Sequence, residues 1–165
     1  MLGKLWGWVK ANFVYDEIQD VRQFNQKFGL MVNEVPVHLT QRKLLERIQF
    51  LQEELDEFKE AVENQSLADQ ADALIDIVYV AKGTAIMLGL PWEDLWLDVQ
   101  RANMEKVRGV TKRGHLVDCV KPPGWKPPTT VEILKEAGYH PAQFCGHGQS
   151  YIREDKCYDD AINVG

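Results

Sequence analysis

Apolar residues recur at helical spacing along much of the chain. Residues 15–28 carry them at intervals of three and four, and Gly29 ends this pattern. A second stripe after Thr40, which can cap a helix, has steps of four and three residues and so occupies one helix face. The stripe consists of Leu44, Ile48, Leu51, Leu55, Phe58 and Val62. Both patterns predict amphipathic helices.

Two further helices follow. Ser66 and Asp69 have a variant of capping-box spacing, which opens a third helix reaching about residue 88. Pro91 suits the first turn of a fourth helix over residues 92–108. A glycine directly follows each of these helices. Because no segment alternates at strand period, we expect an all-α four-helix bundle.

The pattern becomes loop-like after residue 110, in "KRGHLVDCVKPPGWKPPTT". A short helix is predicted at residues 131–137, capped by Thr129 or Thr130. We therefore divide the chain into a helical core, residues 1–110, and an irregular C-terminal extension, residues 111–165. The extension is expected to pack on the core or on a neighbouring subunit.

Composition indicates a soluble globular chain. Of the 165 residues, 45% are hydrophobic and 27% are charged, which is too apolar for a disordered chain. A net charge of −6 argues against a general nucleic-acid binder, and no apolar run is long enough to cross a membrane. Trp6, Trp8 and Val9 could form a membrane-surface helix, but packing against the body or a partner subunit is expected instead. Three scattered cysteines favour a reducing cytoplasm.

Acidic residues gather on the second and third helices. Glu54 and Glu57 project from adjacent turns of one side, and Asp69, Asp72 and Asp76 form a stripe on the next helix. Between residues 53 and 76 a single base, Lys59, faces nine acids, so internal salt bridges cannot satisfy them. These acids are Glu53, Glu54, Asp56, Glu57, Glu60, Glu63, Asp69, Asp72 and Asp76. Asp56, Glu60 and Glu63 fit an ordinary solvated face.

Asp76 does not fit a solvated face, because Ile75, Ile77, Val78 and Val80 surround it in the sequence. The apolar third helix predicts that Asp72 and Asp76 are buried. Burying an unpaired carboxylate costs several kcal/mol or more, and Lys82 falls on the wrong side of the helix to offset that cost. Carboxylates without His or Cys favour Mg²⁺ or Mn²⁺ as the compensating cation.

Basic residues lie at and just beyond the end of the predicted fourth helix. Asn103 and Lys106 are three residues apart, and Arg108, Lys112 and Arg113 come just after them. Taken alone, Lys106 is an ordinary surface lysine. Beside a carboxylate–metal cluster it is a phosphate contact, since a metal and an ammonium group together neutralise a polyphosphate. The sequence has no glycine-rich phosphate loop of the P-loop kind.

The order of these motifs resembles a known superfamily. "EELDE" at residues 53–57, "DALID" at 72–76 and "ANMEK" at 102–106 are similar to the MazG-like all-α nucleoside triphosphate pyrophosphohydrolases, in the phosphoribosyl-ATP pyrophosphohydrolase-like branch. The resemblance covers about residues 16–128. Its pattern is Glu-x-x-Glu, an interval, and Glu-x-x-Asp, where Ala73 replaces the third acid and Asp72 is the local substitute.

The resemblance implies hydrolysis of a (deoxy)nucleoside triphosphate to its monophosphate and pyrophosphate, with Mg²⁺ or Mn²⁺, in nucleotide-pool control. It also implies a homodimer or homotetramer that completes the bundle. The expected metal ligands are Glu54, Glu57, Asp72 and Asp76, and Glu53 would orient the attacking water. The expected substrate-binding residues are Asn103, Lys106, Tyr79 and Lys121.

Two other interpretations stay open at this point. The chain could be a non-catalytic acidic helical dimer that acts as an interaction module. A structural zinc could bind the C-terminal residues Cys145, His147 and Cys157, with Cys119, although their spacing is unusual for zinc modules. The base and sugar of the substrate, and stepwise removal of phosphates, also stay open.

Overall fold

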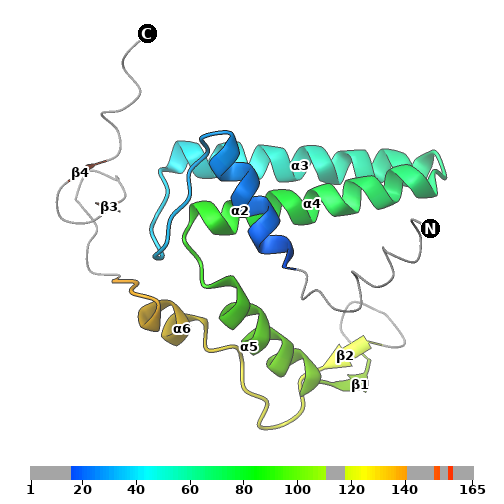
Figure 1. Ribbon diagram of the computed structural model, residues 1–165. Coiled ribbons are helices and arrows are strands. Elements are labelled where there is room, and N and C mark those ends of the chain that lie inside the picture. The colour runs from blue at the N-terminus through cyan, green and yellow to red at the C-terminus, as the bar shows by residue number, and fades with distance from the viewer. Residues whose placement is uncertain (1–15, 111–117, 141–150, 153–155, 158–165) are drawn as a thin grey trace, which may run out of the picture. The chain divides into compact units, whose positions relative to one another are not determined.

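The computed structural model describes residues 16–110 and 118–140, together with the backbone of the short strands at 151–152 and 156–157 (Figure 1). The predicted residues Trp6, Trp8, Val9, Lys112, Arg113, Cys145 and His147, and the Cys157 side chain, lie outside this description. Helices dominate the described part, which confirms the all-α fold class. They are α2 (Glu17–Lys27), α3 (Gln41–Glu63), α4 (Leu67–Met87), α5 (Trp92–Met104) and α6 (Thr130–Glu136).

The chain divides into two compact units. The first comprises residues 1–32 and 42–87, and so contains α2, α4 and nearly all of α3. The second comprises residues 33–41 and 88–165, with α5, α6 and the strands. No described helix is both long and apolar enough to cross a membrane.

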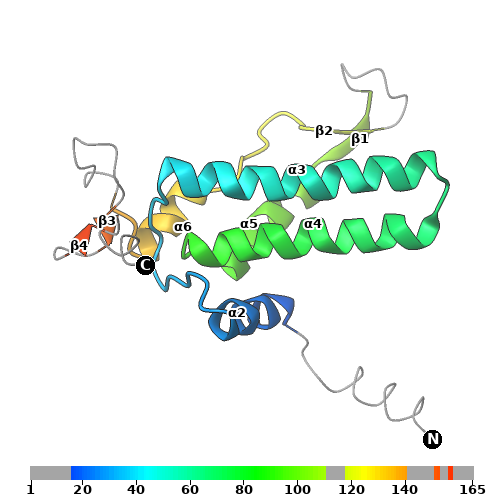
Figure 2. The same ribbon diagram turned by 90° about the horizontal axis from the view of Figure 1, so that it is seen from above.

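Helices α3 and α4 of the first unit form a long antiparallel hairpin (Figure 2). The predicted cap is present at its turn, where the Ser66 hydroxyl accepts a hydrogen bond from the Asp69 amide at 3.3 Å. The two helices are also joined by side chains. Near the turn, the Gln70 amide group donates to the Ala61 carbonyl at 3.3 Å.

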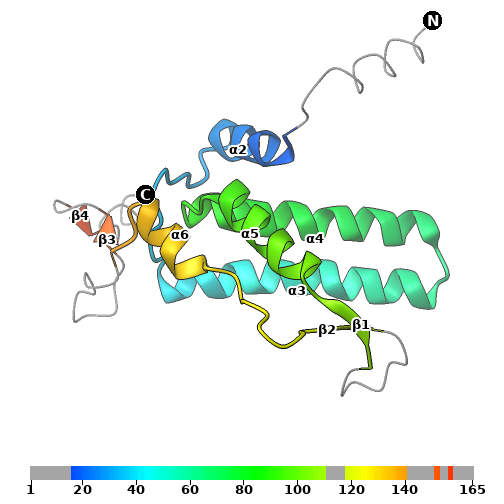
Figure 3. The same cartoon turned by 90° about the horizontal axis from the view of Figure 1, so that it is seen from below.

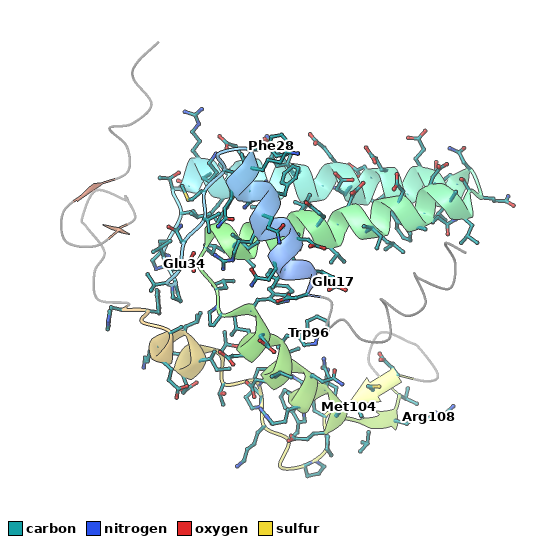
Figure 4. All side chains as sticks on the ribbon, viewed as in Figure 1. Glu17, Phe28, Glu34, Trp96, Met104 and Arg108 are labelled. Atoms are coloured by element: carbon teal, nitrogen blue, oxygen red, sulfur yellow. The ribbon has the colours of Figure 1, made fainter. Side chains whose placement is uncertain are left out.

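Helix α2 crosses α4 on one side (Figure 1). Its first turn is capped by Asp16, whose carboxylate accepts from the Ile18 amide. Lys82 of α4, only 7% exposed, lies 2.5 Å from the Glu17 carboxylate, so its buried charge is paired. Glu17 and Phe28 mark the two ends of this helix region in Figure 4.

The predicted burial of the acids on α4 is wrong. Asp72 is exposed and Asp76 is half-buried, while Ile75 beside them is 66% exposed. The cause is the position of α2, which packs on α4 where Val21 and Lys82 are buried, whereas no other described helix packs on the apolar side around Ile75. An apolar helix therefore need not be buried within its own chain. Completion of the bundle by a second subunit stays a prediction.

The fourth helix is shorter than predicted. α5 ends at Met104, and β1 (Val107–Gly109) follows it and pairs with β2 (Asp118–Val120) in an antiparallel ladder (Figure 3). The prediction that strands are absent is therefore wrong. Gly109 fits this ladder because a Cβ there would lie 2.6 Å from the Val120 side chain. The predicted short helix near residue 131 is confirmed as α6, with Thr129 at its N-cap position, but the Thr129 hydroxyl makes no capping hydrogen bond and instead donates to Asp98 at 3.1 Å.

Candidate active site

The predicted metal ligands lie on the α3–α4 hairpin. Glu54 is half-buried on α3 beside the exposed Glu53 and Glu57, while Asp72 and Asp76 belong to α4. The hydrogen bonds between the helices fix how they face each other. Residue 61 lies opposite residue 70, and residue 47 lies opposite residues 80 and 84. In an antiparallel pair this register places Glu54 opposite residues 73–77, which include Asp76, and Asp72 directly precedes this range.

Acids of both helices influence the pKa of Glu54. Partial burial raises the pKa of Glu54, and the charges of Glu57, Asp76, Glu53 and Asp72 raise it further, in that order. Among the residues that the structure describes, no cation offsets this effect on the Glu54 pKa. Carboxylates from both helices therefore repel one another at one place on the hairpin.

The neighbouring acids on the outer side of α3 behave differently. Asp56 lies 2.6 Å from the Lys59 ammonium and accepts a hydrogen bond from Gln52 at 2.9 Å. These contacts lower the pKa of Asp56, with the Lys59 hydrogen bond as the main cause. Glu60 and Glu63 are exposed. This is the solvated face that the sequence predicts.

The carboxylate cluster consists of Glu53, Glu54, Glu57, Asp72 and Asp76. Its oxygen atoms are the kind of ligand that a hard divalent cation prefers, but the side chains do not converge on one point. Among the residues that the structure describes, no three His, Cys, Asp or Glu side chains are placed to hold one metal ion. Oxygen ligands on two facing helices are nevertheless what Mg²⁺ and Mn²⁺ use. Since Glu57 and Asp72 are exposed, their side chains are free to rotate toward Glu54 and Asp76.

A shared cation should make stability depend on both metal and pH. We expect Mn²⁺ to raise Tm, since a ligand at about 100 times its Kd stabilises the folded state by about 2.7 kcal/mol. Lowering the pH from about 7 to about 5 should shrink this increment, because protons compete with metal for carboxylates. Without metal, lowering the pH should instead stabilise the folded protein. The raised pKa of Glu54 means that the folded form holds its proton more tightly, so acidification relieves repulsion.

Thermal unfolding with Mn²⁺ or chelator at several pH values measures both effects. Glu54→Gln should reduce the metal increment, and Glu60→Gln, on the solvated face, is the matched control. A Tm that is indifferent to Mn²⁺ and chelator at neutral pH would contradict a metal site on this hairpin.

The predicted cationic group contains Lys106 and Lys121, which directly flank the Val107–Val120 pair of the β1–β2 ladder. The Lys106 ammonium donates to the Asn103 side-chain oxygen at 2.7 Å, although Lys106 lies beyond the helix and not on its face as predicted. Lys121, after β2, holds its ammonium 4.3 Å from the centre of the Trp125 ring. In Figure 4, Met104 and Arg108 mark the end of α5 and the following strand. Tyr79, in contrast, belongs to α4, where its ring contacts Phe24 edge-on at 5.5 Å.

Trp125 joins the loop after β2 to α5, a role that the apolar and acidic patterns of the sequence do not predict. Its indole N–H donates to the carbonyl of Ala102, which is 1% exposed, at 2.7 Å. This bond ties the loop after β2 to the end of α5. The "PPGW" stretch was available as a signal, since a tryptophan in a proline-rich loop needs a partner for its N–H group.

Trp125→Phe should lower Tm by about 2–4 °C, because a net hydrogen bond is worth about 1 kcal/mol. The matched control is Trp96→Phe, since Trp96 is 61% exposed and its indole N–H has no partner among the described residues. Thermal unfolding measures both Tm values. An equal decrease in Tm for the two variants would contradict the role of the Trp125 N–H group.

The second unit contains a cavity between α5 and α6. It has a volume of about 510 Å³ and is lined by residues of α5 and α6 and by Ala137. None of the predicted site residues contributes to it. The candidate site is therefore the carboxylate cluster, and the cationic group at the end of α5 is the candidate for phosphate binding.

Fold and residues together define a class: an all-α protein with a cluster of carboxylates on two antiparallel helices. A comparison with known families matches residues 21–103, half of the chain, to the family described as phosphoribosyl-ATP pyrophosphohydrolase. The chain belongs to this family, which indicates a pyrophosphohydrolase that acts on a nucleotide-like substrate. The match includes the carboxylate cluster and Asn103 and ends before Lys106 and Lys121. A comparison with curated proteins finds no match.

Proposed function

We propose that the protein hydrolyses a (deoxy)nucleoside triphosphate to its monophosphate and pyrophosphate, with Mg²⁺ or Mn²⁺ bound by the carboxylate cluster. The observation that carries this proposal is the register of the α3–α4 hairpin, which brings Glu54 and Asp76 to the same place, where the surrounding carboxylates raise the pKa of Glu54. Membership of a pyrophosphohydrolase family supports it.

Each acid has a distinct part in this proposal. Glu54, Glu57 and Asp76 hold the metal, and Asp72 takes the place of the third acid in the Glu-x-x-Glu and Glu-x-x-Asp pattern. The bound metal would neutralise phosphate charge and lower the pKa of a water molecule. Glu53 is exposed and adjacent to the ligands, so it can accept the proton of the attacking water.

The bonds that change are those of the α-phosphate. The water oxygen forms a bond to the α-phosphorus while the bond from that phosphorus to the bridging oxygen of the β-phosphate breaks. Pyrophosphate then leaves with the electron pair of the broken bond, and Glu53 holds the proton of the water.

The cationic group is proposed to bind the phosphates. Lys106 is held in place by Asn103, and Lys121 is held by the Trp125 ring, so both ammonium groups have a defined position. A positioned ammonium stabilises the charge that develops on a phosphate chain. Tyr79 is proposed to contact the substrate from α4.

Subunit association is the second part of the proposal. Leu74, Ile75 and Val78 on α4 are 48%, 66% and 48% exposed. We propose that a second copy of this chain covers them, since contiguous apolar surface commonly marks an interface. Size measurement in solution tests this, and a monomer at micromolar concentration would contradict it.

A substrate screen tests the proposed reaction. The eight common nucleoside triphosphates and phosphoribosyl-ATP would each be incubated with the protein and Mg²⁺ or Mn²⁺, and the products separated. We expect a monophosphate and pyrophosphate from at least one nucleoside triphosphate. Turnover of phosphoribosyl-ATP alone would contradict the proposed substrate class, and a diphosphate product would indicate stepwise removal. No turnover of any compound would favour an interaction module.

A further inference from the structure

Arg47 is a half-buried cation that the proposed reaction does not yet use. On α3 it lies seven residues, two helical turns, before Glu54, so the two side chains share a face. Its guanidinium Nε donates to the Thr84 hydroxyl at 3.0 Å, and Nη2 donates to the Val80 carbonyl at 3.0 Å. Arg47 is thus held between α3 and α4, in the same helix pair as the carboxylate cluster.

The charge of Arg47 lacks a direct counterion. No carboxylate among the described residues makes an ion pair with it, and burial lowers the pKa of its guanidinium despite the nearby charge of Glu46. Leaving a guanidinium partly desolvated without a counterion is unfavourable. The hydrogen bonds to α4 use two of its five N–H groups, so the guanidinium can take a further partner.

The orientation of the guanidinium shows which atoms remain available. The Nε–Nη2 edge is bound to α4, and three of the five N–H donors have no acceptor in the described part of the chain. These donors include the parallel pair at the Nη1–Nη2 end. The Arg47 guanidinium carbon lies over the Phe50 ring, 5.1 Å from the ring centre, in a cation–π contact, and the ring is 45% exposed. The parallel donor pair therefore lies above the face of this ring, where a planar ligand with two adjacent acceptors can bind it.

The position of Arg47 relative to the acids indicates which part of a nucleotide it would meet. Seven residues of helix span about 10 Å. Val80 and Thr84 are likewise one and two turns beyond Asp76 on α4. This separation is comparable to that between the α-phosphate and the base of a nucleotide, so a substrate whose phosphates are held near Glu54 and Asp76 can bring its base to Arg47.

We propose that Arg47 and Phe50 form the base-binding subsite and that its ligand is guanine, whose O6 and N7 atoms accept two parallel N–H bonds. Arginine pairs with this edge of guanine in a bidentate manner, whereas adenine presents a donor at the equivalent position. The inference rests on the proposed function, because it uses the carboxylate cluster as the phosphate end of the site. It extends that function by naming a guanine nucleotide as the substrate.

Binding of the monophosphates GMP and AMP tests the subsite without hydrolysis. We expect GMP to bind about 5- to 150-fold more tightly than AMP, the range that one bidentate arginine–guanine pair provides. Arg47→Met should abolish this preference by weakening GMP binding. Arg47→Lys keeps the charge but loses the paired donors, so it should abolish the preference as well. Calorimetry gives the affinities, and Tm shows whether each variant is folded.

The control is Arg42→Met, since Arg42 is an exposed arginine of the same helix that pairs with Glu46. It should leave the preference for GMP unchanged. Equal or no binding of GMP and AMP by the unaltered protein would overturn the inference. A preference that persists in folded Arg47→Lys would overturn it too. Weaker binding of tripolyphosphate, which has no base, to Arg47→Met would make Arg47 a phosphate contact and also contradict it. Pyrophosphate release is measured separately, so failure here is distinguishable from failure of the proposed function.

Discussion

Asp76→Asn is expected to lower pyrophosphate release at least 100-fold while the protein stays folded. Asp76 lies on α4 opposite Glu54 and adds to the repulsion that raises the Glu54 pKa. An amide removes one ligand charge, and the metal contributes several kcal/mol of transition-state stabilisation, where each 1.36 kcal/mol is about tenfold in rate. Steady-state kinetics at saturating Mg²⁺ measure the effect.

The matched control for Asp76→Asn is Glu60→Gln, which changes the same kind of charge on the solvated face of α3. It should leave activity almost unchanged. Without metal, Asp76→Asn should have the same or a higher Tm than the unaltered protein, since it relieves repulsion. Activity within a few-fold of the unaltered protein would exclude Asp76 as a ligand.

Lys106→Ala should lower kcat/KM by roughly 10- to 150-fold. The Lys106 ammonium is held by Asn103 at 2.7 Å and is proposed to contact the phosphates. A charge-assisted hydrogen bond of this kind is worth about 1.5–3 kcal/mol, which corresponds to that change in catalytic efficiency. The increment in Tm caused by Mn²⁺ should survive, because Lys106 is not a metal ligand.

Lys135→Ala provides the comparison, because Lys135 is an exposed lysine on α6 without a role in the proposal. An effect of Lys106→Ala no larger than that of Lys135→Ala would show that Lys106 is an ordinary surface lysine. The phosphate contacts would then belong to Lys121 or to the basic residues Lys112 and Arg113.

The α3–α4 hairpin could be predicted because its signals are local. The stripe from Leu44 to Val62 follows the helical period, and the Ser66 cap is set by a three-residue spacing. The acids on adjacent turns follow from the same geometry. In the structure these acids raise the pKa of Glu54, as expected from the clustering that the sequence predicts.

Burial around Asp76 could not be predicted, because it depends on which side of α4 another element covers. The helix is apolar on most sides, yet within the described part of the chain α2 packs on it around Lys82 and leaves Ile75 exposed. Sequence periodicity shows which faces can be buried, and it does not show what covers them.

The residue at which α5 ends could not be predicted from local sequence signals either. β1 and β2 are three residues each, too short for an alternating pattern to be distinguished from the end of a helical one.

The role of Arg47 could not be predicted for a related reason. This residue is adjacent to the apolar stripe and two turns before Glu54, and its significance appears only when Val80 and Thr84 are seen to hold it.

Pyrophosphate release measured against Mg²⁺ concentration, with the unaltered protein and Glu54→Gln, tests the central claim most directly. We predict that a nucleoside triphosphate gives monophosphate and pyrophosphate in equal amounts, that release rises with Mg²⁺ and stops with chelator, and that Glu54→Gln is nearly inactive. Release that continues in chelator, or that Glu54→Gln supports at the rate of the unaltered protein, would contradict a metal-dependent pyrophosphohydrolase site on the α3–α4 hairpin.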